Sequence, residues 1–248
     1  MGAYGFRIEG APEDDWLAVT GGQDWPLLTL DRDPSVSMRD QARVDWGRLH
    51  ADVAMQMPPD EIIHPLLGRM LMLLFETRGI DAMHGGVLLG GEGAWIVVGE
   101  RRAGKSTLLA QCHLMGAEIA SDDIVVLEGT RCLGGPRCID LRRASARRLG
   151  AGLPVRGGTK QRIRLPPVVA EAELAGVIFL AWGERLELIP LRPSERLSRL
   201  AAHRAAESWP HSASLVLDIA ALPAYELRRP RRLDSLPNSA TLLMERLA

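Results

Sequence analysis

The sequence predicts an α/β fold preceded by a small β-rich unit. Short apolar runs separated by Gly, Pro and Asp fill residues 1–60, a pattern typical of short strands. After Pro58 and Pro59, apolar runs alternate with helical patterns. A glycine-rich motif lies between a run suited to a buried strand and a segment of good helix formers. We therefore expect a β-rich domain at 1–60 and an α/β domain at 61–248.

The elements of the second part follow in order. Asp60 is expected to cap a helix that runs to about Arg78, because apolar residues recur there at helical spacing. Strands are expected at 84–89, 94–98, around 119 and at 124–127, then at 176–180, 186–191 and near 224–227. Helices are expected at 105–115, at 193–209 and from about Ser239. The stretch up to Leu165 is mixed and gives no clear pattern.

The composition is that of an ordinary globular protein. The 248 residues are 46% hydrophobic and 25% charged, enough to bury one substantial core. A formal net charge of −1 argues against a nucleic-acid-binding surface. Two arginine clusters, at 142–148 and 228–232, are interpreted as solvated faces, with contact to a phosphate or an acidic peptide as the alternative.

Location and redox state follow by default. The longest apolar stretch, 65–75, contains Arg69 and is much shorter than the roughly 20 residues of a membrane span. The first residues lack a basic start and an apolar centre, so we expect a cytoplasmic protein without a membrane partner. Three cysteines without paired spacing are interpreted as reduced structural thiols.

The glycine-rich motif is the most informative segment. Residues 99–106, Gly-Glu-Arg-Arg-Ala-Gly-Lys-Ser, fit the phosphate-binding pattern Gly-x-x-x-x-Gly-Lys-Ser/Thr without a mismatch. Glycines let successive backbone N–H groups surround phosphate oxygens, and the following helix adds the partial positive charge of its N-terminus. Lys105 is expected to reach the β- and γ-phosphates and Ser106 to bind Mg²⁺. The expected nucleotide-binding residues here are Gly99, Arg101, Arg102, Ala103, Gly104, Lys105, Ser106 and Thr107.

Two adjacent carboxylates, Asp122 and Asp123, interrupt an apolar run sixteen residues beyond Ser106. Because neighbours on a strand point to opposite faces, both can serve one site only if a turn or bulge lies there. One of them can then bind Mg²⁺ and the other can take a proton from an attacking hydroxyl. His84 precedes the strand before the motif and is a candidate neighbour of the γ-phosphate or of an aspartate.

Lysine is rare in this chain. Of the 30 basic residues only Lys105 and Lys160 are lysines, which suggests that a compact ammonium is required where lysine persists. Lys105 meets that expectation through the motif. Lys160 is therefore a candidate second cation of the active site, with an exposed loop lysine as the alternative.

Together these residues resemble a known family. The segments at 84–88, 99–106 and 121–123 resemble the catalytic domain of HPr serine kinase/phosphorylase, which carries His-Gly-Val, a phosphate-binding loop and Ala-Asp-Asp in this order. The resemblance implies a core like that of phosphoenolpyruvate carboxykinases. It implies ATP and Mg²⁺ as cofactors, Asp122 as the base, and Asp123 as a metal partner that also holds His84.

More of the chain resembles a looser group of HPr-kinase-related proteins found beside lasso-peptide and other peptide-maturation genes. This likeness covers residues 1–60, the segment 160–162 and the ending at 224–230. It implies catalysis by Lys160 and nucleotide binding by Arg162. The late Leu-Glu-x-Arg-Gly-x-Gly stretch of true HPr kinases is absent, so the resemblance does not extend to phosphorylase activity or to HPr as the substrate.

A transporter-type ATPase is an alternative class of protein, because residues 156–162 are weakly similar to the Ser-Gly-Gly-Gln signature of those enzymes. No apolar strand ending in Asp-Glu follows, which argues against that class. The predicted function is ATP-dependent phosphorylation of a hydroxyl, serine on a peptide or small protein. A catalytically silent ATP-binding module and a small-molecule kinase stay open as alternatives. The oligomeric state, including a homo-oligomer, also stays open. For residues 1–60 the hypothesis is recognition of the acceptor.

Overall fold

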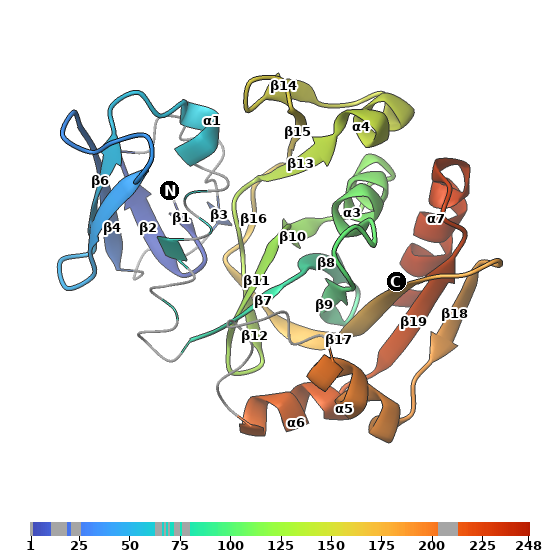
Figure 1. Cartoon of the computed structure of the whole chain (residues 1–248). Helices are drawn as coiled ribbons and strands as arrows, with labels where there is room; N and C mark the ends of the chain where they lie inside the picture. Colours follow the sequence, from blue (N-terminus) through green and yellow to red (C-terminus); the bar gives the residue numbers. More distant parts are fainter. Residues whose placement is uncertain are drawn as a thin grey trace.

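The computed structural model describes residues 2–10, 19–20, 26–62, 66, 68, 70, 71, 75, 80–202 and 213–248. Figure 1 shows a large central sheet, a separate sheet of N-terminal strands beside it, and a small sheet next to helix α3 (Lys105–Leu114). The mixed α/β class expected from the sequence is therefore present.

The N-terminal strands form a sheet of their own. This five-stranded sheet has the order β1-β2-β4-β6-β5 and consists of β1 (Gly2–Ala3), β2 (Phe6–Glu9), β4 (Leu27–Asp33), β6 (His50–Ala54) and β5 (Ala42–Asp45). In β2 buried and exposed side chains alternate, as expected for a sheet with one face on a core. The apolar run at 16–19 lies outside the described residues except for Val19, which with Thr20 forms β3 (Val19–Thr20) and pairs with β16 (Val168–Val169).

The helix expected from Asp60 to about Arg78 is described only in part. Helix α1 (Pro59–Glu61) opens it, and the described residues between 62 and 75 are helical. Those with apolar side chains are buried, namely Ile62, Leu66, Met70, Leu71 and Phe75. They pack in one core with the N-terminal strands and with Ile124 and Leu133 of the central sheet. The remaining residues up to Arg78 lie outside the described part of the chain.

The central sheet has nine strands. Its main path is β10-β8-β9-β17-β12-β11-β7, and β19 pairs with β17 and with β18. The strands are β7 (Asp81–His84), β8 (Gly86–Gly90), β9 (Gly93–Val98), β10 (Ile119–Ser121), β11 (Ile124–Glu128), β12 (Arg131–Leu133), β17 (Glu171–Trp182), β18 (Glu187–Pro190) and β19 (Ala224–Arg229).

Helices cover both faces of this sheet (Figure 1). Helices α3 and α7 (Leu236–Leu247) lie on one face, and α5 (Pro193–Ala202) and α6 (Ala213–Ala221) on the other. Strand β9 serves both cores: Trp95 and Val97 pack with α3 and α7, whereas Ile96 and Val98 pack with α5 and α6. This alternation explains why β9 reads as a continuous apolar run.

The predicted end of the chain needs one correction. Helix α7 begins at Leu236, three residues before the expected start at Ser239, and Pro237 lies in its first turn, where proline is well tolerated. The helix expected at 193–209 is described as α5 up to Ala202, and residues 203–212 lie outside the described part.

A third sheet occupies the stretch that gave no sequence pattern. Strands β13 (Cys138–Arg142), β15 (Lys160–Arg164) and β14 (Leu153–Val155) pair in the order β13-β15-β14, and α4 (Arg143–Leu149) follows β13 directly. Inside this sheet the buried Arg162 forms an ion pair with the buried Asp140, with Nε 2.7 Å from Oδ1.

The strand expected at 84–89 is in fact two strands, β7 and β8, which separate at Gly85. A Cβ at Gly85 would lie 2.9 Å from the carbonyl oxygen of Val97, so only glycine lets the strands pack there. The strands that pair with β7 and β8 are interrupted at the same level. β10 pairs with β8 and β11 pairs with β7, and Asp122 and Asp123 lie between β10 and β11 in the chain. The turn predicted at this acidic pair is therefore present.

Two smaller expectations can also be compared with the structure. Cys112, Cys132 and Cys138 are free and buried, as predicted. Among the helices of the described segments, none is both long and apolar enough to cross a membrane.

Candidate active site

The loop at 99–104 joins the end of β9 to the start of α3. Gly104 adopts a left-handed conformation (φ 83°) immediately before the helix. The Lys105 side chain, only 7% exposed, folds back over the loop, and its Nζ donates hydrogen bonds to the carbonyl oxygens of Gly99 (2.9 Å) and Glu100 (3.3 Å). Burial lowers the pKa of Lys105, while Asp122 and Asp123 act in the opposite direction. The ammonium is therefore held between the loop and the acidic turn.

Arg229, at the end of β19, supports the loop from behind. Its Nη2 donates a hydrogen bond to the carbonyl oxygen of Ala103 (2.8 Å), and its guanidinium lies 4.6 Å from the ring centroid of Trp182. Arg229 is buried, and this burial lowers its pKa to about 10. A cation held on an aromatic face and bonded to loop carbonyls fixes the backbone of the loop.

Gly104→Ala is expected to disturb this arrangement. A Cβ at Gly104 would lie 2.7 Å from Nη2 of Arg229, in addition to the strain of a positive φ. We expect a loss of about 1–3 kcal/mol in the free energy of unfolding and at least tenfold weaker nucleotide binding. Gly116→Ala is the matched control, because Gly116 also has a positive φ (98°) but nothing lies within 4 Å of its Cβ position. Equal effects of the two variants on nucleotide binding in calorimetry would contradict a specific role of Gly104.

Asp122 lies behind the loop. It is 9% exposed and accepts a hydrogen bond from the side chain of Ser106. Its Oδ1 is buried and has no hydrogen-bond partner among the described residues. Burial, followed by the charge of Asp123, raises the pKa of Asp122 to about 7. A buried carboxylate oxygen that lacks a donor, next to a serine hydroxyl, is chemically suited to a cation.

Asp123 faces the opposite way. Its backbone is left-handed (φ 72°), a conformation that aspartate tolerates better than most residues, and this turns the chain between β10 and β11. Its side chain is 41% exposed, and Oδ1 lies 3.4 Å from Nδ1 of His84. The same Nδ1 lies 2.8 Å from the backbone oxygen of Asp123. The turn thus directs one carboxylate to the loop and its neighbour, with His84, to the open cleft.

Arg137 holds the strand that leads into this turn. It is 1% exposed, and its guanidinium donates to the carbonyl oxygens of Ile119 (2.6 Å) and Ala120 (3.0 Å) on β10, and to Pro166 (2.8 Å). These carbonyls lie at the level where β10 loses its regular pairing with β8. A buried arginine therefore replaces the missing ladder bonds next to the acidic pair.

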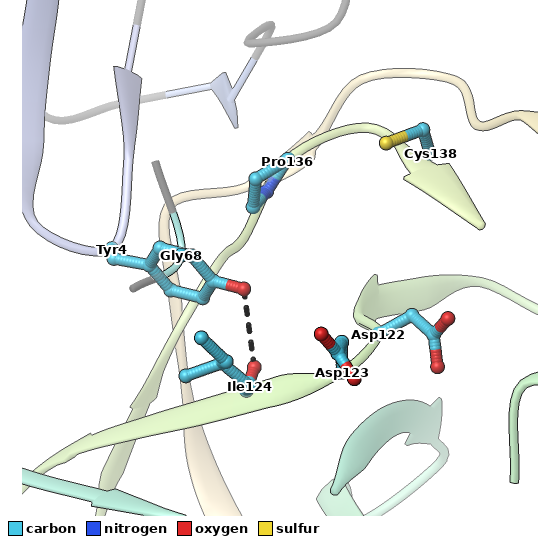
Figure 2. Close-up of a pocket in the computed structure, with 7 residues that line it drawn as sticks. All are labelled: Tyr4, Gly68, Asp122, Asp123, Ile124, Pro136 and Cys138. Atoms are coloured by element: carbon cyan, nitrogen blue, oxygen red, sulfur yellow. Dashed lines mark hydrogen bonds between the residues drawn. The ribbon is translucent and has the colours of Figure 1, made fainter. Parts of the chain in front are cut away.

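Tyr4, from the N-terminal sheet, reaches the same turn. Figure 2 draws Tyr4 together with Asp122 and Asp123 among the residues that line one pocket, and its hydroxyl donates a hydrogen bond to the carbonyl oxygen of Ile124 (3.2 Å). The Ser121 hydroxyl donates to the same oxygen. Tyr4 is 2% exposed, and burial raises its pKa. Between these residues lies a cavity of about 10 Å³, room for roughly one water molecule.

Tyr4→Phe is expected to lower the free energy of unfolding by about 1 kcal/mol. The hydroxyl loses its hydrogen bond to Ile124 and its long contact with the Ser121 hydroxyl (3.4 Å), while Ser121 still satisfies the carbonyl of Ile124. We also expect severalfold slower phosphoryl transfer, because the acidic turn loses one anchor. Tyr225→Phe is the control: Tyr225 is the other tyrosine, and its hydroxyl accepts a hydrogen bond from Arg246. Equal changes in kcat for both variants in a transfer assay would show that the Tyr4 hydroxyl does not position the turn.

One cleft of about 560 Å³ collects most of the predicted site residues. Those that line it are His84, Arg101, Arg102, Gly104, Lys105, Ser106, Thr107, Asp123 and Lys160. Four others do not line it: Asp122 lies behind Ser106, Gly99 and Ala103 contribute backbone oxygens to hydrogen bonds, and Arg162 is buried in its ion pair with Asp140. Lys160 is a half-buried residue at the start of β15 rather than an exposed loop lysine.

The cleft also contains residues that sequence reasoning did not select. Arg142, Arg229, Arg231 and Arg232 line it, although the two arginine clusters were interpreted as solvated faces. Trp182 lines it too, with the guanidinium of Arg231 5.8 Å from its ring centroid. Their positions in the sequence could have indicated a role in the site, because Trp182 and Arg229 each stand at the end of a strand. The two strands are parallel neighbours, and these two residues are paired in register.

The described residues contain no group of three or more His, Cys, Asp or Glu side chains arranged for a metal. Mg²⁺ needs only one or two carboxylates, together with phosphate oxygens and water. Ser106 and Asp122 supply a hydroxyl and a carboxylate oxygen without a hydrogen-bond donor, so the residues present fit this ion.

The likeness to known proteins is found among solved structures. No family model matches the chain, and no curated protein matches it. Among solved structures, the Hpr(Ser) kinase/phosphatase from Coxiella burnetii is similar over 67% of this chain and 97% of that chain, with 17% sequence identity and a TM-score of 0.34. At this level the likeness does not bear on activity, and the function has to be argued from the site.

Proposed function

We propose that this protein is a Mg-ATP-dependent phosphotransferase whose acceptor is a hydroxyl group, serine on a peptide or small protein. One observation supports this most strongly. Ser106, the last residue of the glycine-rich motif, is hydrogen-bonded to Asp122, while the next residue, Asp123, faces the cleft that the motif lines. Phosphoryl transfer requires a phosphate cradle, a metal position and an acceptor-activating group in one place.

In this proposal the loop at 99–104 binds the phosphates of the nucleotide. Its backbone N–H groups and the N-terminus of α3 provide the positive potential for phosphate oxygens. Lys105, whose ammonium donates hydrogen bonds to the carbonyls of Gly99 and Glu100, also lines the cleft and is the proposed cation for those oxygens. Arg101 and Arg102 line the same cleft beside it. When bound, Mg²⁺ neutralises charge that develops on the transferred phosphoryl group.

The acceptor side belongs to Asp123 in this proposal. The family resemblance gave the role of base to Asp122, with Asp123 as the metal partner. The geometry favours the reverse, because Asp122 is buried against Ser106, whereas Asp123 lines the cleft through which an acceptor hydroxyl must arrive. A base has to lie within hydrogen-bond reach of the proton that it removes. The imidazole of His84 is placed to orient the Asp123 carboxylate.

The function is tested by incubating the full chain with γ-³²P-ATP, Mg²⁺ and serine-containing peptides, a lasso-peptide-type precursor among them. Label on serine, absent with Lys105→Met, is the expected result. Transfer to small hydroxyl metabolites is detected by mass spectrometry. ATP binding without transfer to any peptide or metabolite would identify a catalytically silent binding module instead. Label on a metabolite but not on peptides would identify a small-molecule kinase. Absence of nucleotide binding would reject the proposal.

A further inference from the structure

We infer that Arg142 and Lys160 form an anion-binding subsite for the acceptor, and that the acceptor therefore carries a carboxylate or phosphate group near its reacting hydroxyl. This inference rests on the proposed function and specifies its substrate class. The two residues lie on the three-stranded sheet, on β13 and β15, and both line the 560 Å³ cleft.

The cleft carries more positive charge than a nucleotide requires. Eight of its lining residues are Lys or Arg, and only two, Asp123 and Asp140, are acidic. Asp140 is already neutralised by the buried guanidinium of Arg162. The loop side has its own cations in Lys105, Arg101 and Arg102. A magnesium-bound triphosphate matches only part of this charge, so an anionic acceptor is favoured electrostatically.

Arg142 and Lys160 are directly opposite each other in the antiparallel register of β13 and β15. Like charges at directly opposite positions destabilise a sheet. Among the described residues, neither side chain forms an ion pair, whereas Asp140 and Arg162, two positions along the same strands, neutralise each other. A pair of cations left uncompensated on a cleft wall is the arrangement that a bound carboxylate or phosphate would stabilise.

This wall is connected to the nucleotide side. Helix α4 starts at Arg143, immediately after Arg142, and Ser145 on it accepts a hydrogen bond from the Thr107 hydroxyl of α3 (3.1 Å). Thr107 is the second residue after Lys105. An anion held by Arg142 and Lys160 therefore lies in the cleft that also contains Asp123, so the same acceptor can offer its hydroxyl to the proposed base.

The rarity of lysine gives a direct test. Lys105 and Lys160 are the only lysines, and both line this cleft. The full chain is saturated with a non-hydrolysable ATP analogue and Mg²⁺, with occupancy checked by calorimetry. It is then acetylated with an amine-selective reagent, and the acetylation rate of Lys160 is read by peptide mass spectrometry. The probes are N-acetylated pentaglutamate and inorganic phosphate, with N-acetylated pentaarginine as a cationic control that the reagent does not modify.

We expect pentaglutamate, phosphate or both to slow acetylation of Lys160 at least fivefold, and pentaarginine to have no effect. Protection by pentaglutamate alone assigns a carboxylate-bearing acceptor, and protection by phosphate alone a phosphate-bearing one. Arg142→Gln is expected to weaken the protecting anion about tenfold, since one charge-assisted contact is lost. Arg148→Gln, an exposed arginine on α4 that does not line the cleft, should change nothing.

Three outcomes would overturn the inference. Protection of Lys160 by the analogue alone would assign this subsite to the nucleotide. Binding of the analogue without protection by either anion would reject the subsite while the proposed function stands. Failure of the analogue to bind would reject both.

Discussion

Asp122→Asn is expected to abolish phosphoryl transfer and, at the same time, to stabilise the free protein at pH 8. The loss of transfer, a hundredfold to a thousandfold or more, follows from removing a charged oxygen ligand from the proposed Mg²⁺ position. The gain in stability follows from burial: at pH 8 the wild-type protein holds an ionised carboxylate that is 9% exposed, with one oxygen lacking a hydrogen-bond donor among the described residues.

The sign of this effect depends on pH. The pKa of Asp122 is raised from 3.8 to about 7 on folding, so the folded protein binds this proton more tightly than the unfolded chain does. The resulting stabilisation is complete below pH 4 and is lost as the pH rises through about 7. Asparagine has no such proton. The free energy of unfolding of the variant, relative to that of the wild type, should therefore rise between pH 4 and pH 8, by roughly 4 kcal/mol at the upper end.

Urea unfolding at pH 5 and pH 8, without nucleotide or Mg²⁺, measures this difference. Asp218→Asn, an exposed aspartate on α6, is the control and should give the same difference at both pH values. If Asp122→Asn were destabilised equally at pH 5 and pH 8, ionisation of the Asp122 carboxylate would not destabilise the free wild-type protein. Wild-type transfer rates in that variant would remove Asp122 from the metal position.

Asp123→Asn is expected to lower kcat by about 10²–10⁴ and to leave the affinity for the ATP analogue within about twofold of wild type. The amide is nearly isosteric with the carboxylate, and the left-handed backbone at this position is one that asparagine also adopts, so the turn should be kept. The expected loss is therefore that of a proton acceptor alone.

The measurement is kcat and KM for both substrates in the transfer assay, compared with Asp122→Asn. The division of roles predicts different results: Asp123→Asn lowers kcat at any Mg²⁺ concentration, whereas for the residual activity of Asp122→Asn the Mg²⁺ concentration needed for half-maximal rate also rises. If Asp123→Asn retained wild-type kcat, the base would have to be the neighbouring carboxylate, as the family resemblance implies. His84→Ala should give a smaller loss, because the imidazole acts through Asp123.

The sequence identified the parts of the site that are set locally. The strand, loop and helix at 94–114 and the break at Asp122 and Asp123 follow from neighbouring residues, and each is present. The sheet of β13, β14 and β15 was missed because Asp140 and Arg162 occupy interior positions in it. A buried ion pair looks, in sequence, like two surface residues, so it conceals the apolar pattern that predicts strands.

The arginine clusters could not be resolved for a related reason. Arg228 and Arg229 are adjacent, yet Arg229 is buried under the loop while Arg228 is partly exposed beside Glu226. What distinguishes them is Trp182, which comes from a strand more than forty residues earlier and meets Arg229 only in the folded sheet. Which member of a charged pair enters a cleft is a tertiary property, and no local pattern contains it.

The contact between Tyr4 and the carbonyl of Ile124 has a thermodynamic consequence. The fourth residue of the chain and the residue next to the acidic pair share one buried hydrogen bond, so undocking of the N-terminal strands and loosening of that turn are linked equilibria. Linkage is reciprocal: a partner that bound the docked strands would tighten the binding of the proposed magnesium nucleotide by the same factor by which that nucleotide would tighten the binding of the partner. A binding curve measured for the nucleotide at the acidic turn would therefore also report whether the N-terminal strands are docked.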